Sequence, residues 1–446
     1  MPRQYFIWTI GCQMNEADSR KVAAHLELLG YQATTKPEEA DVAVLNTCVV
    51  KQQAEERIYG RLGSLKTLKE QRPGYTIALM GCLVGVKEAP RLRKQFPFVD
   101  VFMSPSDPAP LVEHLTTQGL HDLTLDQDNY ERSLRDAIQD ADHVLPLEQR
   151  GSRVTAYVPV VLGCSHACSF CIIPYRRGIE RSRPMADILR EIRGLVDQGV
   201  KEIMLLGQIV DRYGLELPEP TDLADLLTAV NAVPGLERLR FLTSHPNWMS
   251  DKLLDAVANL DKVCPQLEVP VQAGNDEVLA RMRRGYTSEA YLHLIERIRR
   301  RLPDAAINTD IIVGFPGETE AQFDDTMRLC AEVGFDKIHI SRYSQRPRTV
   351  AARFMTDDVP EAEKARRHQV LDAQQAAFLA TANAKLLGRT EQVLAERHDQ
   401  GRWSGRTRHN KLVHFAADGD WLGRVAAVKI NKTSAFTLYG ELVGGA

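Results

Sequence analysis

The chain has 446 residues, of which 44% are hydrophobic and 26% charged, and its net charge is −3. This length suits about three globular domains, and the composition excludes disordered, collagen-like and low-complexity proteins. No apolar stretch reaches the roughly 20 residues of a membrane-spanning helix, and Asn15 and Glu16 interrupt the first segment too early for a signal peptide. We therefore expect a cytoplasmic protein without membrane contact, whose eight cysteines are not a disulfide scaffold.

The charge is unevenly distributed along the chain. Residues 364–446 hold 13 Lys and Arg against 7 Asp and Glu, a local charge of +6 that leaves −9 for the remainder. A basic segment on an acidic body predicts contact with a polyanion at the C-terminus, with a solvated basic face as the plainer alternative.

The first 120 residues alternate strand-like and helical patterns. Three apolar runs have strand length: Tyr5–Ile10, Val42–Leu45 and Thr76–Met80. Two helical patterns lie between them: Asp18–Leu29 and Ala54–Glu70. This order predicts a small parallel α/β domain over residues 1–120, followed by a polar linker over 121–150.

A second alternating series fills the middle of the chain. Six further runs have strand length: Val158–Leu162, Glu202–Leu206, Leu239–Leu242, Leu267–Val271, Asn308–Val313 and Lys337–Ile340. With helical patterns between them, they predict a partial (βα)6 barrel over residues 151–380 whose functional groups lie at the carboxyl ends of the strands. A long helical pattern follows at Glu361–Leu387, and short runs after Thr390 predict a small antiparallel β-barrel over residues 381–446.

Three cysteines follow the first three predicted strands directly. They are Cys12, Cys48 and Cys82, and Gly11 and Gly81 give the backbone freedom to turn at the first and third of them. Parallel strands of one sheet end on the same edge, where open α/β sheets bind ligands. One such cysteine would suggest core packing, but three at equivalent positions predict a shared metal or cluster site.

Three more cysteines form the motif Cys-x3-Cys-x2-Cys at the start of the predicted barrel. They are Cys164, Cys168 and Cys171, and no second Cys or His pair lies nearby to complete a zinc site. Three thiolates can hold three irons of a four-iron cluster, which leaves the fourth iron open to a cofactor or substrate. We interpret His166 as a loop residue, and Cys330 as a core residue; Cys264 has no assignment.

The Cys-x3-Cys-x2-Cys motif, with Phe170 before its last cysteine, resembles the radical S-adenosylmethionine (SAM) superfamily. Other segments resemble the methylthiotransferases within that superfamily, and the C-terminal barrel resembles a TRAM domain. The matching segments are Thr9–Asn15, Leu45–Cys48, Met80–Cys82, Ile172–Gly178, Ser182–Pro184, Leu206–Gln208, Thr243–Pro246, Pro270–Gln272 and Asp310–Thr319.

The segment Gly11–Asn15 resembles the branch (MiaB type) that makes 2-methylthio-N6-dimethylallyladenosine next to the tRNA anticodon. The resemblance implies SAM and two [4Fe-4S] clusters as cofactors. The cluster on the barrel cysteines would cleave SAM to a radical that removes the adenine C2 hydrogen, which is too weakly acidic for acid–base chemistry. The cluster on the N-terminal cysteines would present the sulfur, and a second SAM would methylate it.

Other positions supply further candidate site residues. The expected SAM-binding residues lie at barrel strand ends or in the loops after them: Phe170, Gln208, Ser244, Gln272, Gly314 and Gly317. The expected RNA-binding residues are basic: Arg176, Arg177, Arg402, Arg406, Arg408 and Lys411. The first two could instead bind the SAM carboxylate, and Trp403 and Phe415 would stack bases. Capping, core lining and plain surface charge are the alternatives.

A few positions depart from the family pattern. Ile209 and Asp211 stand where Asn is more usual, Glu268 where His is common, and Ala273 where Ser is common. These positions belong to the barrel interior, so they affect the expected substrate rather than the clusters.

Two alternative functions stay open. A methylthiotransferase could act on threonylcarbamoyladenosine in tRNA or on an aspartate of a ribosomal small-subunit protein. A non-catalytic metal-containing RNA-binding protein is the alternative from another class, although closed structural sites keep four protein ligands rather than three. The expected partners of the enzyme are tRNA, an electron donor of the flavodoxin or ferredoxin type and an iron–sulfur carrier protein, and we expect a monomer.

Overall fold

The computed structural model describes residues 3–49, 52–120 and 145–443. The chain divides into two compact units. The first comprises Met1–Gly151, Tyr157–His166 and Ile172–Gln198, and the second comprises Ser152–Ala156, Ala167–Cys171 and Gly199–Ala446. Most of the predicted linker, residues 121–144, lies outside the described residues. The predicted boundary at residue 150 does not coincide with this division. Residues 157–166 and 172–198, which were expected in the barrel, belong to the first unit.

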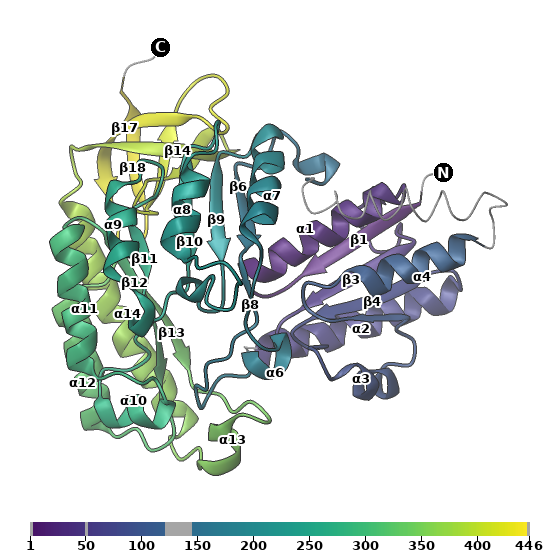
Figure 1. Cartoon of the computed structure of the whole chain (residues 1–446), viewed down its shortest axis with the longest axis horizontal. Coiled ribbons are helices and arrows are strands. Elements are labelled where there is room, and N and C mark those ends of the chain that lie inside the picture. The colour runs from purple at the N-terminus through teal and green to yellow at the C-terminus, as the bar shows by residue number, and fades with distance from the viewer. Residues whose placement is uncertain (1–2, 50–51, 121–144, 444–446) are drawn as a thin grey trace. The chain divides into compact units, whose positions relative to one another are not determined.

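The first unit is built on a five-stranded parallel sheet with the order β2-β1-β3-β4-β5 (Figure 1). Its strands are β1 (Gln4–Thr9), β2 (Gln32–Ala33), β3 (Val42–Thr47), β4 (Thr76–Gly81) and β5 (Val101–Met103). Four helices accompany them: α1 (Gln13–Leu28), α2 (Gln52–Gln71), α3 (Ala89–Gln95) and α4 (Ala109–Leu120). The parallel α/β prediction is confirmed.

Both faces of this sheet are apolar, as a parallel sheet covered by helices requires. On one face, Val22 and Leu26 of α1 and Leu111 of α4 pack against the strands. On the other, Ile58 and Leu62 of α2 belong to the hydrophobic core. Helix α1 begins at Gln13, five residues earlier than its apolar pattern predicts, because Asn15, Asp18 and Ser19 are polar residues that are buried in its first turns and interrupt that pattern.

Later segments of the chain complete this unit. They include most of β6 (Thr155–Pro159), the two-stranded sheet of β7 (Val161–Leu162) and β8 (Arg181–Ser182), and the helices η1 (Leu147–Gln149), α6 (Ile173–Arg177) and α7 (Met185–Asp197).

The second unit contains the remaining strands of the predicted α/β barrel. They are β9 (Glu202–Leu206), β10 (Arg238–Leu242), β11 (Gln266–Glu268), β12 (Ala306–Val313) and β13 (Lys337–Arg342). Two three-stranded sheets, β10-β9-β6 and β11-β12-β13, are linked by a parallel bridge between Leu239 and Val263. The helices are η2 (Val210–Arg212), α8 (Leu223–Asn231), η3 (Pro246–Trp248), α9 (Asp251–Asn259), α10 (Asp276–Met282), α11 (Ser288–Arg301), α12 (Glu320–Val333) and α13 (Val350–Phe354).

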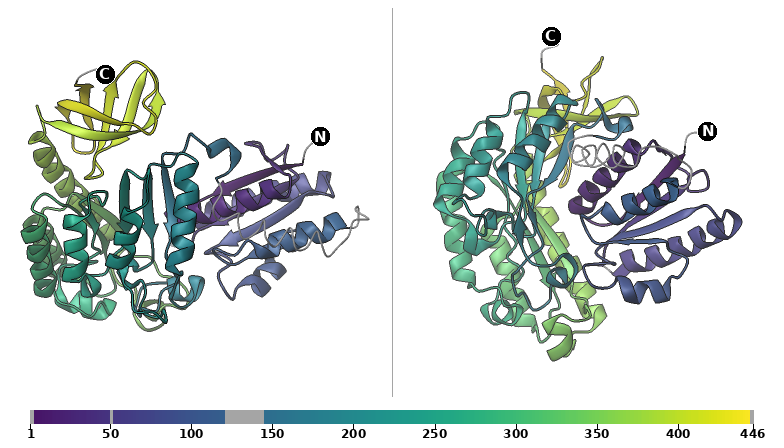
Figure 2. Two further views of the ribbon diagram at one scale, coloured as in Figure 1. Left: turned by 45° about the horizontal axis from the view of Figure 1, so that its top comes forward. Right: turned by 45° about the vertical axis from the view of Figure 1, so that its right-hand side comes forward.

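Helix α14 (Glu361–Ala384) leads into a closed five-stranded barrel (Figure 2). Its strands are β14 (Thr390–Asp399), β15 (Arg402–Arg406), β16 (Leu412–Ala416), β17 (Val425–Thr433) and β18 (Leu438–Leu442), in the order β14-β15-β16-β18-β17. The antiparallel prediction is wrong for one pair, since β16 and β18 run parallel. The reason is that β15 and β17 both run antiparallel to β14, while β16 runs antiparallel to β15 and β18 to β17, so β16 and β18 point the same way when they pair to close the barrel.

Two buried arginines of β10 hold the closed barrel against the α/β barrel. Arg238 donates to the carbonyl oxygen of Gln392 at 2.9 Å. Arg240, whose side chain is 0% exposed, pairs with Glu202 at 2.9 Å and donates to the carbonyl oxygens of Thr407 and Arg408, both at 2.8 Å. Because hydrogen bonds from charged donors are strong and directional, these contacts define how the closed barrel is oriented on β10.

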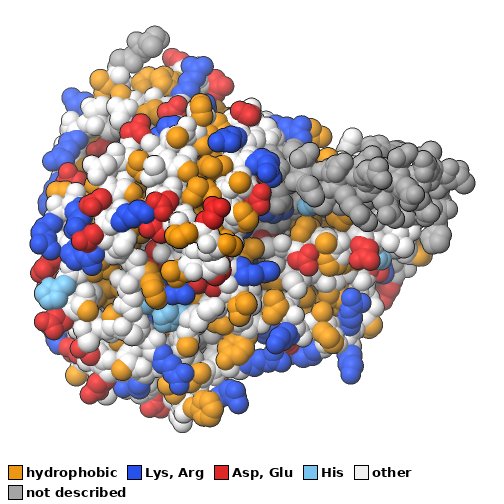
Figure 3. Space-filling view, in the orientation of Figure 1, with side chains coloured by type: hydrophobic (Ala, Val, Ile, Leu, Met, Phe, Trp, Pro, Cys, Tyr) orange, Lys and Arg blue, Asp and Glu red, His pale blue; other side chains and the backbone are white. Residues whose placement is uncertain are grey.

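The surface has no single sign of charge on the face in Figure 3, where Lys and Arg are interspersed with Asp and Glu. Within the part of the chain that the structure describes, no helix is both long and apolar enough to span a bilayer.

Candidate active site

The structure brings the three N-terminal cysteines together at the carboxyl edge of the first sheet. Cys12 precedes α1, and Cys48 and Cys82 follow β3 and β4. A Cβ on Gly11, at φ +140°, would lie 3.0 Å from the Cβ of Cys48 and 2.6 Å from Asn15 Nδ2, so only glycine fits there. After burial, the negative charges that Cys48 and Cys12 can carry also raise the pKa of Cys82. The three cysteines thus lie at one edge of the sheet, and their joint binding of a cluster stays a prediction.

A buried arginine from α6 reaches this cysteine set. Arg177 donates to Asn15 Oδ1 at 2.8 Å and to Asp18 Oδ2 at 3.3 Å, and it also hydrogen-bonds Cys82. Burial raises the pKa of the Cys82 thiol to about 11, and the positive charge of Arg177 opposes that rise. Sequence reasoning missed Asn15 and Asp18 as site residues, because the burial that marks these polar side chains is visible only in the structure.

The expectation that Arg176 and Arg177 contact RNA needs correction. Both are buried, with 8% and 9% of their surface exposed. Arg176 donates to the carbonyl oxygen of Leu83 at 3.3 Å and packs against Gly85. Both guanidinium groups are therefore engaged inside the first unit, and a phosphate could reach them only if that packing opened.

The second cysteine motif lies in the segment that follows β7. Within the first unit, Cys164 donates its N–H to the carbonyl oxygen of Gly178 at 3.1 Å. A Cβ on Gly163 would collide with the carbonyl oxygen of Ile179, so no residue with a side chain fits at this position. Within the second unit, Cys171 donates its N–H to Cys168 O at 3.2 Å.

Phe170 anchors the cysteine loop in a hydrophobic cluster. It is partly buried against a group that includes Ala273, Leu279, Phe315 and Tyr343. Phe315 belongs to the loop after β12, so the cysteine loop and that loop share one core. The prediction that Phe170 packs near the SAM adenine stays a prediction.

Two barrel strand ends carry strained backbone. Thr243 and Gln272 have φ values of +70° and +77°, which side chains other than glycine rarely adopt. Such strain persists only where surrounding contacts impose it, and it clusters at functional sites. Gln272 accepts from the N–H of Ile312 and donates to Asp310 O, at 3.0 and 2.9 Å.

Ser244 directly follows Thr243 and is 2% exposed, and its hydroxyl has no hydrogen-bond partner among the described residues. A buried hydroxyl of this kind fits a bound polar ligand. Gln208, the remaining candidate at a strand end, is only partly buried.

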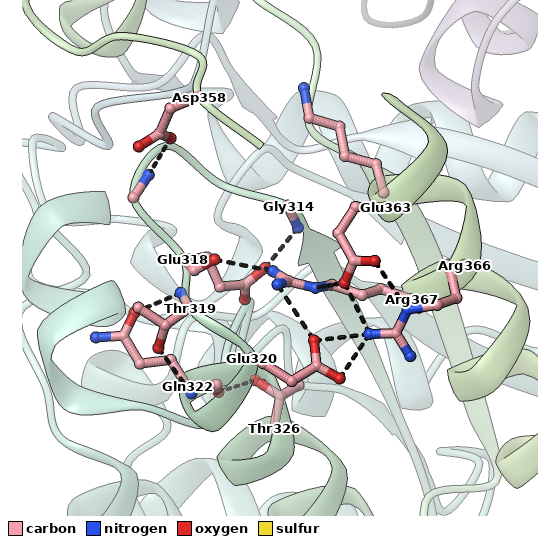
Figure 4. A network of polar contacts seen from close by, with 12 residues as sticks. Gly314, Glu318, Thr319, Glu320, Gln322, Thr326, Asp358, Glu363, Arg366 and Arg367 are labelled. Atoms are coloured by element: carbon pink, nitrogen blue, oxygen red, sulfur yellow. Dashed lines mark hydrogen bonds and ion pairs between the residues drawn. The ribbon is translucent and has the colours of Figure 1, made fainter. Parts of the chain in front are cut away.

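The glycine loop after β12 is braced by α14 (Figure 4). Gly314 donates its N–H to Glu318, and Arg367 of α14 donates to the same carboxylate at 2.9 Å. A Cβ on Gly314, at φ +71°, would collide with the side chain of Lys364, and Gly317 donates to Asp358 at 2.7 Å. The loop is thus held in one conformation, with its backbone groups fixed in place.

The departure at Glu268 creates an acidic group inside the barrel. Glu268 is buried, with His339 Nε2 3.7 Å from its carboxylate. Burial, and then the neighbouring charge of Asp310, raise the pKa of Glu268 to about 8, against a hydrogen bond from Asn308. At neutral pH the raised pKa favours the protonated carboxyl, which can donate a hydrogen bond.

The donor sets fit iron–sulfur clusters better than single metal ions. Among the described residues, no three His, Cys, Asp or Glu side chains are grouped as ligands of one metal ion. In a four-iron cluster each thiolate binds a different iron, so the sulfur atoms stand farther apart than around one ion. Three thiols per set, Arg177 on Cys82 and the unpartnered hydroxyl of Ser244 are consistent with such clusters and with SAM.

The fold and this site define a radical SAM protein. The profile of the radical SAM superfamily matches residues 158–330, the profile described as uncharacterized protein family UPF0004 matches residues 4–104, and the TRAM domain profile matches residues 384–443. The solved structure of the radical SAM methyltransferase TsrM from Kitasatospora setae, with cobalamin and a [4Fe-4S] cluster bound, aligns with a TM-score of 0.56. That alignment covers 79% of this chain and 74% of that one at 14% identity, which shows the shared fold.

Curated relatives identify the family. The tRNA-2-methylthio-N(6)-dimethylallyladenosine synthase of Chloroflexus aurantiacus is 47% identical over 98% of this chain and 91% of its own. The same-named proteins of Roseiflexus sp. and Dehalococcoides mccartyi are 45% and 44% identical, over 99% and 98% of this chain and 90% and 98% of theirs. This chain belongs to the tRNA-2-methylthio-N(6)-dimethylallyladenosine synthase family.

Proposed function

We propose that this protein converts N6-(dimethylallyl)adenosine next to the tRNA anticodon into its 2-methylthio derivative. The observation that carries this proposal is the 47% identity to the Chloroflexus synthase over 98% of the chain. The two sets of three cysteines, each at strand ends of a parallel α/β fold, support it independently of that name.

Each cysteine set has a separate task in this proposal. Cys164, Cys168 and Cys171 hold the cluster that binds SAM, and Cys12, Cys48 and Cys82 hold the second cluster. When bound, these groups supply the radical that removes the C2 hydrogen and the sulfur that replaces it. The protein contributes fixed positions: the braced Gly314 loop and the Ser244 hydroxyl bind SAM.

The protonated Glu268 can orient a polar group of SAM or of the base within the barrel. A neutral carboxyl offers both a donor and an acceptor, which suits the edge of a purine. Its neighbours there are Asn308, Asp310 and His339.

The closed C-terminal barrel binds the RNA through its exposed cations in this proposal. Arg402 is exposed, whereas Arg408 donates to Val263 O at 2.7 Å and Lys411 pairs with Asp336 at 3.0 Å. Arg406 is partly buried and lies 3.7 Å from Glu396.

The expectation that Trp403 and Phe415 stack bases is corrected, because both lie in the barrel core. A stacked pair, His414 and Tyr439 with ring centroids 5.5 Å apart, lies partly exposed beside the exposed Lys432. These three residues are better placed to contact bases and phosphates.

The direct test is a nucleoside assay on the anaerobically reconstituted full-length protein. It is incubated with SAM, a strong reductant and tRNA that carries dimethylallyladenosine, and the digested RNA is examined by mass spectrometry. We expect the methylthio nucleoside, and its loss in Cys168→Ala and in Cys48→Ala. Cys330→Ala, which removes a buried thiol outside both sets, is the matched control and keeps the product. SAM cleavage without the nucleoside would refute the substrate and turn attention to threonylcarbamoyladenosine or the ribosomal aspartate.

The RNA part is tested by Lys432→Ala, which we expect to weaken tRNA binding severalfold while iron content stays unchanged. Deleting the whole C-terminal barrel is a poorer test, because it would leave Arg238 and Arg240 buried without their partners. Unchanged tRNA affinity in Lys432→Ala and in Arg402→Ala would refute the role of this barrel surface.

The proposed reaction also requires partner proteins and is expected in the cytoplasm. The clusters need a one-electron donor of the flavodoxin or ferredoxin type and an iron–sulfur carrier, and the tRNA substrate suits a monomeric enzyme of the cytoplasm.

A further inference from the structure

The cysteine loop of the barrel is held by the end of α10. Ser169 is 0% exposed and donates its N–H to Met282 O at 3.0 Å and its hydroxyl to Arg281 O at 2.7 Å. The chain then turns at Arg283, whose φ is +58°. This turn directs the next residue back toward the same loop, at Cys168.

That next residue is Arg284, and each nitrogen of its guanidinium group donates one hydrogen bond, one of them to Cys168. Nη1 donates to the sulfur of Cys168 at 3.3 Å, Nη2 donates to Pro270 O at 3.0 Å, and Nε donates to the Tyr286 hydroxyl at 3.0 Å. Tyr286 in turn donates to Val271 O at 2.7 Å. Arg284 itself is 5% exposed, so its charge is poorly screened by water.

Among the described residues, no carboxylate forms an ion pair with Arg284. Its other partners are a peptide carbonyl and a phenol, both neutral, and the Cys168 sulfur is the group among them that carries negative charge as a cluster ligand. Although burial works to lower it, the pKa of Arg284 is raised by Tyr286 and Cys168, so the group stays protonated.

The N-terminal cysteine set has a comparable arginine with a different charge balance. Arg177 hydrogen-bonds Cys82, but it also forms an ion pair with Asp18 at 3.3 Å. The carboxylate offsets much of the positive charge that the sulfur would otherwise experience. In both cysteine sets a buried arginine therefore hydrogen-bonds one thiol. The two sets differ because, across the described ranges, a carboxylate neutralises the arginine only in the N-terminal set.

We propose that Arg284 is a positioning residue that raises the reduction potential of the cluster held by Cys164, Cys168 and Cys171. Hydrogen bonds to ligand sulfurs and nearby charge are established determinants of such potentials. Reduction adds one electron from an external one-electron donor to the cluster, so its negative charge increases, and a fixed cation with an N–H on the sulfur stabilises the reduced form. This inference rests on the proposed function, because it needs the cluster to be present.

The test is a redox titration of the reconstituted full-length protein, followed by electron paramagnetic resonance. The signal of interest is the one that changes when SAM is added, which separates it from the second cluster. At a fixed solution potential, Arg284→Gln should lower the ratio of reduced to oxidised cluster by on the order of tenfold, equivalent to about 59 mV for a one-electron couple. Arg284→Lys keeps the charge without the fixed fork, so its ratio should fall between the two.

Arg283→Gln is the matched control, since it removes the same charge from the adjacent, exposed residue. It should leave the ratio within about twofold of the original protein, because solvent screens an exposed charge. An unchanged ratio in Arg284→Gln, with iron content intact, overturns the inference.

If Arg284→Gln fails to assemble the cluster, Arg284→Lys decides, and a ratio equal to that of the original protein overturns the inference. If the original protein shows no signal that responds to SAM, the proposed function falls together with this inference. A change confined to Arg284 variants leaves both standing.

Discussion

Replacing Arg240 with methionine should weaken the attachment of the C-terminal barrel to the α/β barrel. The guanidinium group is completely buried and serves Glu202 as well as the carbonyl oxygens of Thr407 and Arg408. Arg240→Met keeps most of the side-chain volume but leaves the Glu202 carboxylate buried without its cation. Breaking a buried pair on one side costs about 3–5 kcal/mol of the free energy of unfolding.

The double variant Arg240→Met/Glu202→Leu separates the ion pair from the carbonyl contacts. With both charges gone, the remaining cost is that of the acceptors that lose their donor in either variant, the carbonyl oxygens of Thr407 and Arg408 and Gln266 Oε1, and no buried unpaired charge adds to it. The double variant should therefore be more stable than the single one. Urea unfolding of the full-length protein measures this, followed by tryptophan fluorescence, to which Trp403 in the core of the closed barrel contributes.

Either of two results would contradict this role of Arg240. One is a cost below about 1 kcal/mol for Arg240→Met, since that is the range of exposed ion pairs. The other is a double variant less stable than the single variant. Hydrogen exchange of β14–β18 gives an independent reading, because a loosened junction should increase exchange in the closed barrel first.

Three further predictions concern the site. The pKa of Glu268 is raised to about 8 in the folded protein, so the unfolded chain releases this proton at lower pH than the folded one. As pH rises from 5 to 8, the free energy of unfolding of Glu268→Gln should therefore increase relative to that of the original protein, by about 4 kcal/mol in total. A difference in unfolding free energy that does not vary with pH would contradict this. Gly314→Ala should destabilise more than Gly334→Ala and weaken SAM binding, because both glycines have positive φ but only the first has no room for a Cβ; thermal unfolding and calorimetry compare them. Arg177→Met should cost about 3–5 kcal/mol by leaving Asp18 unpaired and should halve the iron content, and a full iron content would count against its place at the N-terminal cysteines.

The positions of the strands were predictable because they depend on short-range sequence patterns. Cys12, Cys48 and Cys82 follow apolar runs directly, and in a parallel sheet such positions meet at one edge whatever the rest of the chain does. Positive φ at Gly11 and at Gly81 could be inferred in the same way, from the need to turn at a strand end.

The inward and outward faces of the closed barrel were harder to assign. Because basic residues surround them in the sequence, Trp403 and Phe415 were expected to stack on RNA bases. Both are instead buried, and they face each other across β15 and β16. Alternation along a strand shows that one face is apolar, but it does not show whether that face meets a core or a ligand.

By itself, the sequence determined the two cysteine sets, the parallel α/β order and the small barrel at the C-terminus, because strand-length apolar runs and the residues that directly follow them are local features. The tertiary structure alone decided which charges are buried and with whom. Arg177 meets Asp18 from 159 positions away, Arg240 meets Thr407 from 167, and Arg284 meets Cys168 from 116. Basic residues look alike in a sequence, and only the partner that replaces water around each one makes its burial favourable.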